Sequence, residues 1–218
     1  MFDRISGGYD RMNRLMSGGM DGRWRTFTAG VSGVVAGDAV IDVCCGTGDL
    51  SLSLLDRVSS RGRVVGLDFA DEMLDVARTK SSIVEWIQGD ALDLPFDDDQ
   101  FAAATVGFGM RNLPDYARGF TEMARVVKPG GRVVCLELTE PPRAVAPFSR
   151  LWTDRVVPVL GRFVAHDRDA YTYLPQSVHR FPGAEELAEI MRGVGLQRVQ
   201  FKRLNMGVIA VHVGTVAV

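Results

Sequence analysis

The sequence predicts an α/β fold with a mostly parallel sheet and helices on both faces. Short runs rich in β-branched residues alternate with longer stretches of helical periodicity, which is the pattern of strand–helix–strand crossover units. The predicted strands begin roughly 20 to 30 residues apart, enough for a helix and a return. Near the end of the chain, two strand-like runs follow each other with almost no link. We therefore expect five parallel strands and an antiparallel C-terminal hairpin, seven strands in all.

Each element follows from a local pattern. The parallel strands are expected at residues 39–43, 64–68, 83–88, 102–107 and 132–138. The helices between them are expected at 49–58, 71–79 and 115–127, each beginning with an aspartate suited to an N-terminal cap or first turn. The last two strands, 198–204 and 207–213, are separated only by Asn205 and Met206. Such a short link permits only antiparallel pairing.

Composition excludes several classes of protein. The 218 residues are 46% hydrophobic and 24% charged, as in soluble globular proteins, and the length suits one domain. A formal net charge of -2 provides no general electrostatic footprint for nucleic acid. The charged opening lacks the apolar core of a secretory peptide, and no stretch is long enough to span a membrane. We expect a cytoplasmic protein with reduced cysteines and no metal site, because its three cysteines and three histidines are badly spaced for either disulfides or zinc.

The most informative segment is residues 40–49, an apolar strand containing Asp42 that leads through a tight glycine turn into a helix. Because Gly46 and Gly48 lack a Cβ, they allow turn conformations barred to other residues and let a ligand approach the backbone closely. The segment therefore predicts a cofactor cradle. An ordinary tight turn would contain the same glycines, so other residues must decide.

Two acids downstream favour a nucleoside site. Asp68 ends the second strand, where its two oxygens could accept hydrogen bonds from both hydroxyls of a ribose. Asp90 follows the third strand and so lies at the same carboxyl edge of the sheet, where open α/β proteins bind ligands. Phe69 and Leu92 follow these acids closely enough to offer apolar faces to a flat base. Either acid alone would fit a helix cap or a solvated loop, but the ordered set favours a cofactor.

The charge at the helix start separates the candidate cofactors. A pyrophosphate needs a helix N-terminus without negative charge and a third glycine where this chain has Ser51. Asp49 at the helix start would repel a diphosphate, yet it would tolerate a cationic sulfonium with an amino-acid tail. The sequence therefore favours S-adenosylmethionine over NAD. Together with the closing hairpin, this predicts the class I S-adenosylmethionine-dependent methyltransferase fold.

Distinctive motifs run along the whole chain. They are Phe2-Asp3-Arg4-Ile5, Tyr9-Asp10, Trp24-Arg25, residues 42–50, Phe108-Gly109-Met110-Arg111-Asn112, Lys128-Pro129-Gly130-Gly131, Tyr171-Thr172-Tyr173-Leu174 and Gly207-Val208. In these motifs the sequence resembles the quinone-ring C-methyltransferases of ubiquinone and menaquinone synthesis. Many methyltransferases share the glycine loop and the Lys-Pro-Gly-Gly turn, whereas the Tyr-Asp opening and the segment 108–112 are more specific.

The resemblance implies site residues. Carried over residue by residue, it implies that Thr47, Asp68, Asp90 and Ala91 contact S-adenosylmethionine, in agreement with the edge-of-sheet argument. The family usually has serine where this chain has Gly107, so backbone or water must replace that side-chain contact. The implied acceptor is a polyprenyl quinol, with demethylmenaquinol expected first. The alternatives are the benzoquinol step of ubiquinone synthesis, both steps in one protein, or a non-catalytic adenosyl-binding subunit.

Methylation of a ring carbon needs a phenolate that pushes electron density onto that carbon. Arg111 follows the fourth strand at the cofactor edge, and its permanent positive charge suits stabilisation of the phenolate. A turn arginine that pairs with a nearby acid would look the same in sequence. The candidate proton acceptors are Tyr9, Asp10 and His179, or water held by them, and the sequence does not choose among them.

Two segments are expected outside the sheet. Residues 1–36 are expected to form an N-terminal helical cap, and residues 139–183 are too long for a simple connection, so we expect a lid over the acceptor. Its aromatic residues suit an apolar pocket, although core helices would explain them equally well. They are Phe148, Trp152, Phe163, Tyr171, Tyr173 and Phe181. A lipid substrate would bring the protein to the inner face of the membrane, and a homodimer stays an open alternative.

Overall fold

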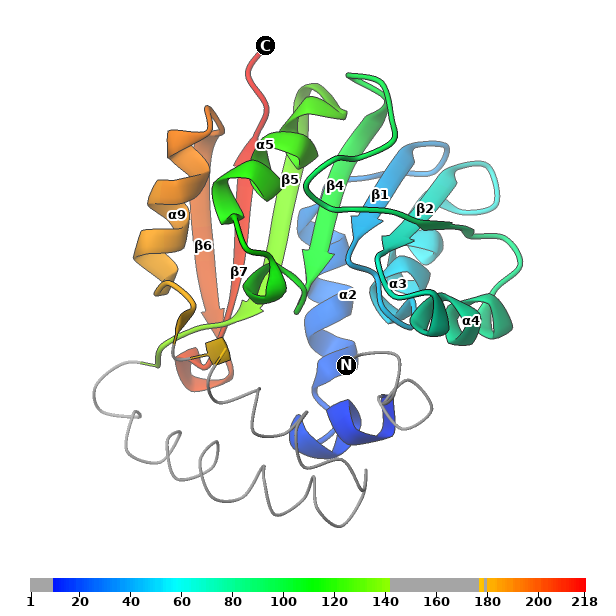
Figure 1. The fold of residues 1–218 in the computed structure, drawn as a ribbon, viewed down its shortest axis with the longest axis horizontal. Coiled ribbons are helices and arrows are strands. Elements are labelled where there is room, and N and C mark those ends of the chain that lie inside the picture. Colours follow the sequence, from blue (N-terminus) through cyan, green and yellow to red (C-terminus); the bar gives the residue numbers. More distant parts are fainter. Residues whose placement is uncertain (1–9, 142–176, 179) are drawn as a thin grey trace.

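The computed structural model describes residues 10–141, 177–178 and 180–218. In this part of the chain, seven strands form one sheet in the order β3-β2-β1-β4-β5-β7-β6 (Figure 1). Neighbouring strands from β3 to β5 run parallel, and β7 lies antiparallel to both β5 and β6. The predicted sheet with its closing hairpin is therefore confirmed. The strands are β1 Ala39–Val43, β2 Arg63–Asp68, β3 Glu85–Gln88, β4 Phe101–Gly107, β5 Val127–Leu138, β6 Gln197–Leu204 and β7 Ile209–Thr215.

Helices cover both faces of this sheet. They are α2 Asp21–Val31, α3 Asp49–Val58, α4 Asp71–Lys80, α5 Tyr116–Arg125 and α9 Ala184–Gly193, with short 3-10 turns η1 Met110–Asn112 and η3 Asn205–Gly207. Successive strand residues point to opposite faces, and the two cores show this alternation. Val40 of β1 packs with α2 and α3, whereas the next residue, Ile41, packs in the cluster that contains buried side chains of α5 and α9.

The predicted helix starts are correct, but the three aspartates act differently. Asp115 is the N-cap of α5, and its carboxylate accepts a hydrogen bond from the backbone N–H of Arg118 at 2.9 Å. Asp49 and Asp71 lie in the first turns of α3 and α4, where a negative charge interacts favourably with the helix dipole. At the end of α5 the prediction ran too long, because the chain passes directly into β5 at Val127.

Phe181 corrects one expectation about the lid. The residue is 7% exposed, and its ring makes an edge contact with that of Tyr116 at a centroid distance of 5.3 Å. It therefore belongs to the core beside α5 and α9 and not to an acceptor pocket. The other five aromatic residues of the predicted lid lie outside the described residues. Within the described ranges, no helix is both long and apolar enough to cross a bilayer.

Candidate functional site

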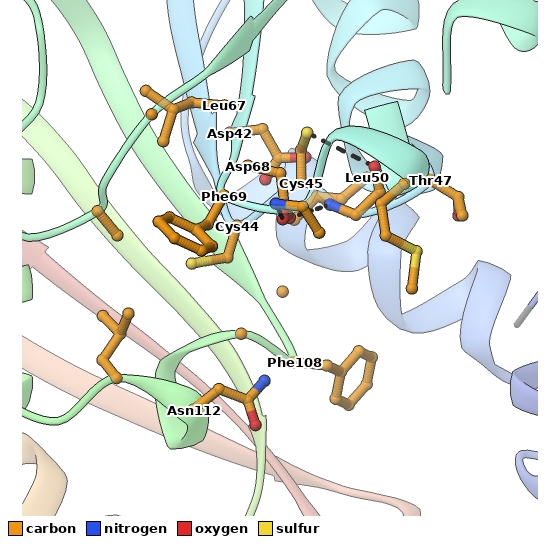
Figure 2. Close-up of a pocket in the computed structure, with 18 of the residues that line it drawn as sticks. Asp42, Cys44, Cys45, Thr47, Leu50, Leu67, Asp68, Phe69, Phe108 and Asn112 are labelled. Carbon is orange, nitrogen blue, oxygen red and sulfur yellow. Dashed lines mark hydrogen bonds between the residues drawn. The ribbon is translucent and has the colours of Figure 1, made fainter. Parts of the chain in front are cut away.

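A cavity of about 340 Å³ opens at the carboxyl edge of the sheet. Its volume lies near the lower end of the range for small-molecule sites. The wall consists largely of the segments that follow β1, β2, β3 and β4, and Figure 2 shows the side chains that point into it. Eight of the nine residues predicted to bind the cofactor line this cavity: Asp42, Gly46, Thr47, Asp68, Phe69, Asp90, Ala91 and Gly107.

Gly48 is the ninth residue, and it has a different function. Its φ is +85°, and a Cβ there would lie 2.4 Å from the indole of Trp86. The glycine is therefore required for the turn and for close packing against β3, while Gly46 reaches the cavity itself. Cys44 also adopts a left-handed conformation, with φ of +54°. No pattern in the sequence indicates this conformation, because a left-handed cysteine is uncommon.

Asp68 connects the glycine turn to the start of α4. The backbone N–H of Gly46 donates to Oδ2 at 2.7 Å, and the N–H of Ala70 donates to Oδ1 at 2.9 Å (Figure 2). Each carboxylate oxygen can accept more than one hydrogen bond. The two backbone donors thus orient the Asp68 carboxylate at the wall of the cavity.

Phe69 and Asp90 extend the same wall. The Phe69 side chain lies at the cavity although the residue is 79% exposed, which is unusual for a large aromatic ring. Asp90 accepts a hydrogen bond from the backbone N–H of Leu92 at 2.9 Å, and Leu92 also lines the cavity. An exposed ring near an oriented carboxylate is the arrangement that a nucleoside needs, with a face for the base and acceptors for hydroxyls.

Asp42 borders the cavity and is fully buried. It accepts hydrogen bonds from the hydroxyls of Ser51 at 2.7 Å and Thr105 at 2.8 Å. Burial nevertheless raises the pKa of Asp42 to about 7. Ser51 therefore holds the Asp42 carboxyl group by a hydrogen bond. The sequence analysis compared Ser51 only with the third glycine of dinucleotide-binding turns and did not predict this contact.

The charge of Asp49 is compensated in the folded protein. Lys80 Nζ lies 2.6 Å from Asp49 Oδ1, and Arg25 lies 3.6 Å from Asp49 Oδ2. The sequence argument against a diphosphate considered the charge of Asp49 without these two partners. Lys80 also pairs with Asp10 at 2.5 Å, and Asp10 accepts a hydrogen bond from the Thr47 hydroxyl at 2.5 Å.

Of the predicted proton acceptors, the structure places only Asp10. Asp10 contacts Thr47 and Lys80 and is not among the residues that line the cavity. Tyr9 and His179 lie outside the described residues. Asp10 therefore contacts the glycine turn through Thr47. Asp10 is itself paired with Lys80, a residue that the sequence analysis did not single out.

Arg111 is held by a buried acid. Its guanidinium donates to Glu137 Oε1 at 2.6 Å and to the carbonyl oxygen of Phe108 at 2.6 Å. The two charged side chains are 9% and 1% exposed. Arg111 is absent from the cavity wall, whereas its neighbour Asn112 lines it (Figure 2). The geometry thus differs from the expected contact with a phenolate. The sequence feature that could have indicated this ion pair is Glu137, an acid within an apolar strand, because a buried acid needs a partner.

Comparison with known proteins assigns the chain. Residues 1–216 match the model of the ubiE/COQ5 methyltransferase family. The chain belongs to this family. It is 40% identical over 222 residues to a demethylmenaquinone methyltransferase of Bacillus cereus, covering 98% of this chain and 93% of that one. The enzyme of the same name from Lactiplantibacillus plantarum is also 40% identical, with coverages of 99% and 94%.

Solved structures confirm the fold. A chain from the Haloferax volcanii complex of the Trm112 methyltransferase activator with a putative methyltransferase superposes with a TM-score of 0.72 at 21% identity, covering 100% of this chain and 98% of that one. A possible histamine N-methyltransferase of Thermotoga maritima gives 0.65 at 19% identity, with coverages of 98% and 97%. The family member described here therefore has the class I fold and is an S-adenosylmethionine-dependent methyltransferase.

Proposed function

We propose that the protein transfers the methyl group of S-adenosylmethionine to a ring carbon of a polyprenylated quinol, demethylmenaquinol. The observation that carries this proposal is the near full-length identity of 40% to proteins named demethylmenaquinone methyltransferase. The cavity supports it, because the predicted cofactor residues lie together at the carboxyl edge of the sheet. The relatives favour the naphthoquinol over the benzoquinol of ubiquinone synthesis.

The residues of the cavity fit the cofactor. Asp68, oriented by two backbone donors, is placed to accept hydrogen bonds from the hydroxyls of the ribose. The exposed ring of Phe69 offers a face on which the adenine can stack. Asp90 and Ala91 border the same space from the segment after β3. Gly107 supplies backbone only, and a Cβ there would lie 3.0 Å from Leu50. The family serine would therefore crowd Leu50 in this chain.

The acceptor side lies opposite the cofactor turn. Figure 2 shows Phe108 and Asn112 across the cavity from Asp68 and Phe69. Bound at this cavity, S-adenosylmethionine would supply an electrophilic methyl group on its sulfur, and the quinol would supply the ring carbon that takes this methyl group and then releases its proton. Phe108 and Asn112 are placed to hold the quinol ring. Arg111 acts as a positioning residue in this proposal, since it holds Phe108 through its carbonyl and is itself held by Glu137.

Proton removal and membrane contact are further parts of the proposal. Tyr9 and His179 stay predictions for the proton acceptor, whereas Asp10 is assigned to the support of Thr47. Because the acceptor is a lipid, the protein is proposed to meet it at the inner face of the membrane from the cytoplasm. The lid at residues 139–183 and a homodimer stay predictions.

A direct assay tests the function. Purified protein is incubated with methyl-labelled S-adenosylmethionine and, in separate reactions, reduced demethylmenaquinol, the corresponding benzoquinol, or no quinol. We expect label in the naphthoquinol product. Label in the benzoquinol alone would overturn the assignment of the ring. Binding of S-adenosylhomocysteine without turnover of either quinol would favour a non-catalytic subunit.

A further inference from the structure

The cavity contains an imbalance of charge. Its described wall includes four carboxylates and a single cationic side chain, that of Arg25. The carboxylates are Asp42, Asp49, Asp68 and Asp90. S-adenosylmethionine presents two charges on its amino-acid tail, an ammonium and a carboxylate. The ammonium finds a favourable field here, but the carboxylate is repelled unless a cation faces it.

Arg25 reaches the cavity from α2 with most of its surface buried. The residue is 8% exposed, and its guanidinium carbon lies 6.0 Å from the centre of the Phe108 ring. One nitrogen, Nη1, donates to Asp21 Oδ2 at 2.5 Å. This ion pair, between residues one helical turn apart, holds the guanidinium in place at the cavity wall.

The guanidinium keeps donors for a ligand. Arginine has five N–H groups in a planar fork, and in the described part of the chain only Nη1 of Arg25 has a hydrogen-bond partner. Asp49 does not satisfy the remaining donors, because its nearest oxygen is 3.6 Å away, beyond hydrogen-bond distance. Asp49 is instead held by Lys80 at 2.6 Å.

From this geometry we infer that Arg25 binds the carboxylate of the cofactor's amino-acid tail. The inference rests on the proposed use of S-adenosylmethionine at this cavity and names the residue that distinguishes the intact tail from a decarboxylated one. A guanidinium fork matches a carboxylate with two parallel hydrogen bonds, and the mostly buried setting strengthens both. Asp21 fixes the fork before the ligand arrives, which reduces the entropy lost on binding.

A series of three ligands tests the inference by calorimetry. S-adenosylhomocysteine carries both tail charges, its decarboxylated analogue carries only the ammonium, and 5′-methylthioadenosine carries neither. For Arg25→Gln, we expect the affinity for S-adenosylhomocysteine to fall roughly 10- to 100-fold, as for loss of charged hydrogen bonds. The affinities for the other two ligands should change by no more than about twofold.

Two further variants separate ligand binding from folding. Arg23→Gln removes an exposed arginine from the same helix and should leave all three affinities unchanged. Arg25→Lys keeps a cation for Asp21 but loses the fork, so it should weaken only S-adenosylhomocysteine, even where Arg25→Gln fails to fold. Equal weakening of all three ligands, or unchanged binding of S-adenosylhomocysteine, would overturn the inference.

The outcome is independent of the acceptor. Binding is measured without quinol, so a failed ligand series with continued methylation of demethylmenaquinol removes only the role of Arg25. If the three affinities change as expected but no quinol is methylated, the proposed function is wrong, and the contact between Arg25 and the tail carboxylate still stands.

Discussion

Replacement of Arg111 by methionine tests whether the buried ion pair of Arg111 and Glu137 stabilises the folded protein. Methionine keeps much of the apolar stem and removes the charge. The change deletes the 2.6 Å charged hydrogen bond and leaves the Glu137 carboxylate 1% exposed. Removal of one partner from a buried pair costs about 3 to 5 kcal/mol. Two backbone N–H groups, of residue 111 at 3.3 Å and Leu138 at 2.8 Å, still donate to Glu137, so we expect a loss of about 3 kcal/mol.

Urea denaturation measures the effect as a shift in midpoint with an unchanged slope. The double variant Arg111→Met/Glu137→Met replaces both charges with apolar groups and should recover most of the lost stability. Arg57→Met, at an exposed position on α3, is the matched control and should change the free energy of unfolding by less than about 0.5 kcal/mol. A loss below about 1 kcal/mol for Arg111→Met, or no recovery in the double variant, would refute a stabilising buried pair.

Three other predictions address the cofactor wall, the glycine turn and pH. Asp68→Ala should weaken S-adenosylhomocysteine binding by about 2 to 4 kcal/mol in calorimetry, and a change below about tenfold would remove Asp68 from the site. Gly48→Ala should lower the free energy of unfolding by about 1 to 3 kcal/mol, because its Cβ would lie 2.4 Å from Trp86, whereas a Cβ on Gly46 meets nothing within 4 Å and should cost less. Burial lowers the pKa of His212 from 6.5, so the unfolded chain binds its proton more readily. Stability from this group is complete above pH 6.5 and declines as the pH falls below it; an unchanged pH profile in His212→Gln would contradict this.

Burial outweighs the neighbouring groups that favour protonation of His212. The hydrogen bond between its Nε2 and the carbonyl oxygen of Ala184, at 2.8 Å, raises the pKa, and its ring packs against Phe201. Arg203 opposes protonation, while Glu185 favours it less strongly than burial disfavours it. Protonation of His212 therefore places a charge inside the core beside α9, and the fold is weakened by acid at this point.

Much of the fold was predictable because its signals are local. The alternation of apolar strands with helices predicts the parallel sheet, and the short link between Leu204 and Ile209 leaves only a hairpin. Parallel strands place the residues after their carboxyl ends at one edge. Asp68 and Asp90 therefore reach the same cavity by topology alone.

The ion pairs that neutralise the charged residues were not predictable in the same way. Asp49 appears in the sequence as an isolated negative charge at a helix start, and its partner Lys80 lies 31 residues away. Arg111 appears in the sequence either as a ligand for a phenolate or as the partner of an acid nearby in the chain, but Glu137, with which it pairs, lies 26 residues away. No local pattern encodes such pairs, because the distance between two side chains depends on how the helices pack on the sheet.

The sequence by itself determined the sheet, the glycine turn, the acids at its edge and the family to which the chain belongs. Only the tertiary structure decided which charges face the ligand and which are already paired. It assigned Arg111 to Glu137, Asp10 to Thr47, and left Arg25 at the cavity wall with donors to spare. The physical reason is that hydrogen-bond geometry follows local sequence in strands and turns, whereas electrostatic pairing and burial depend on non-local packing.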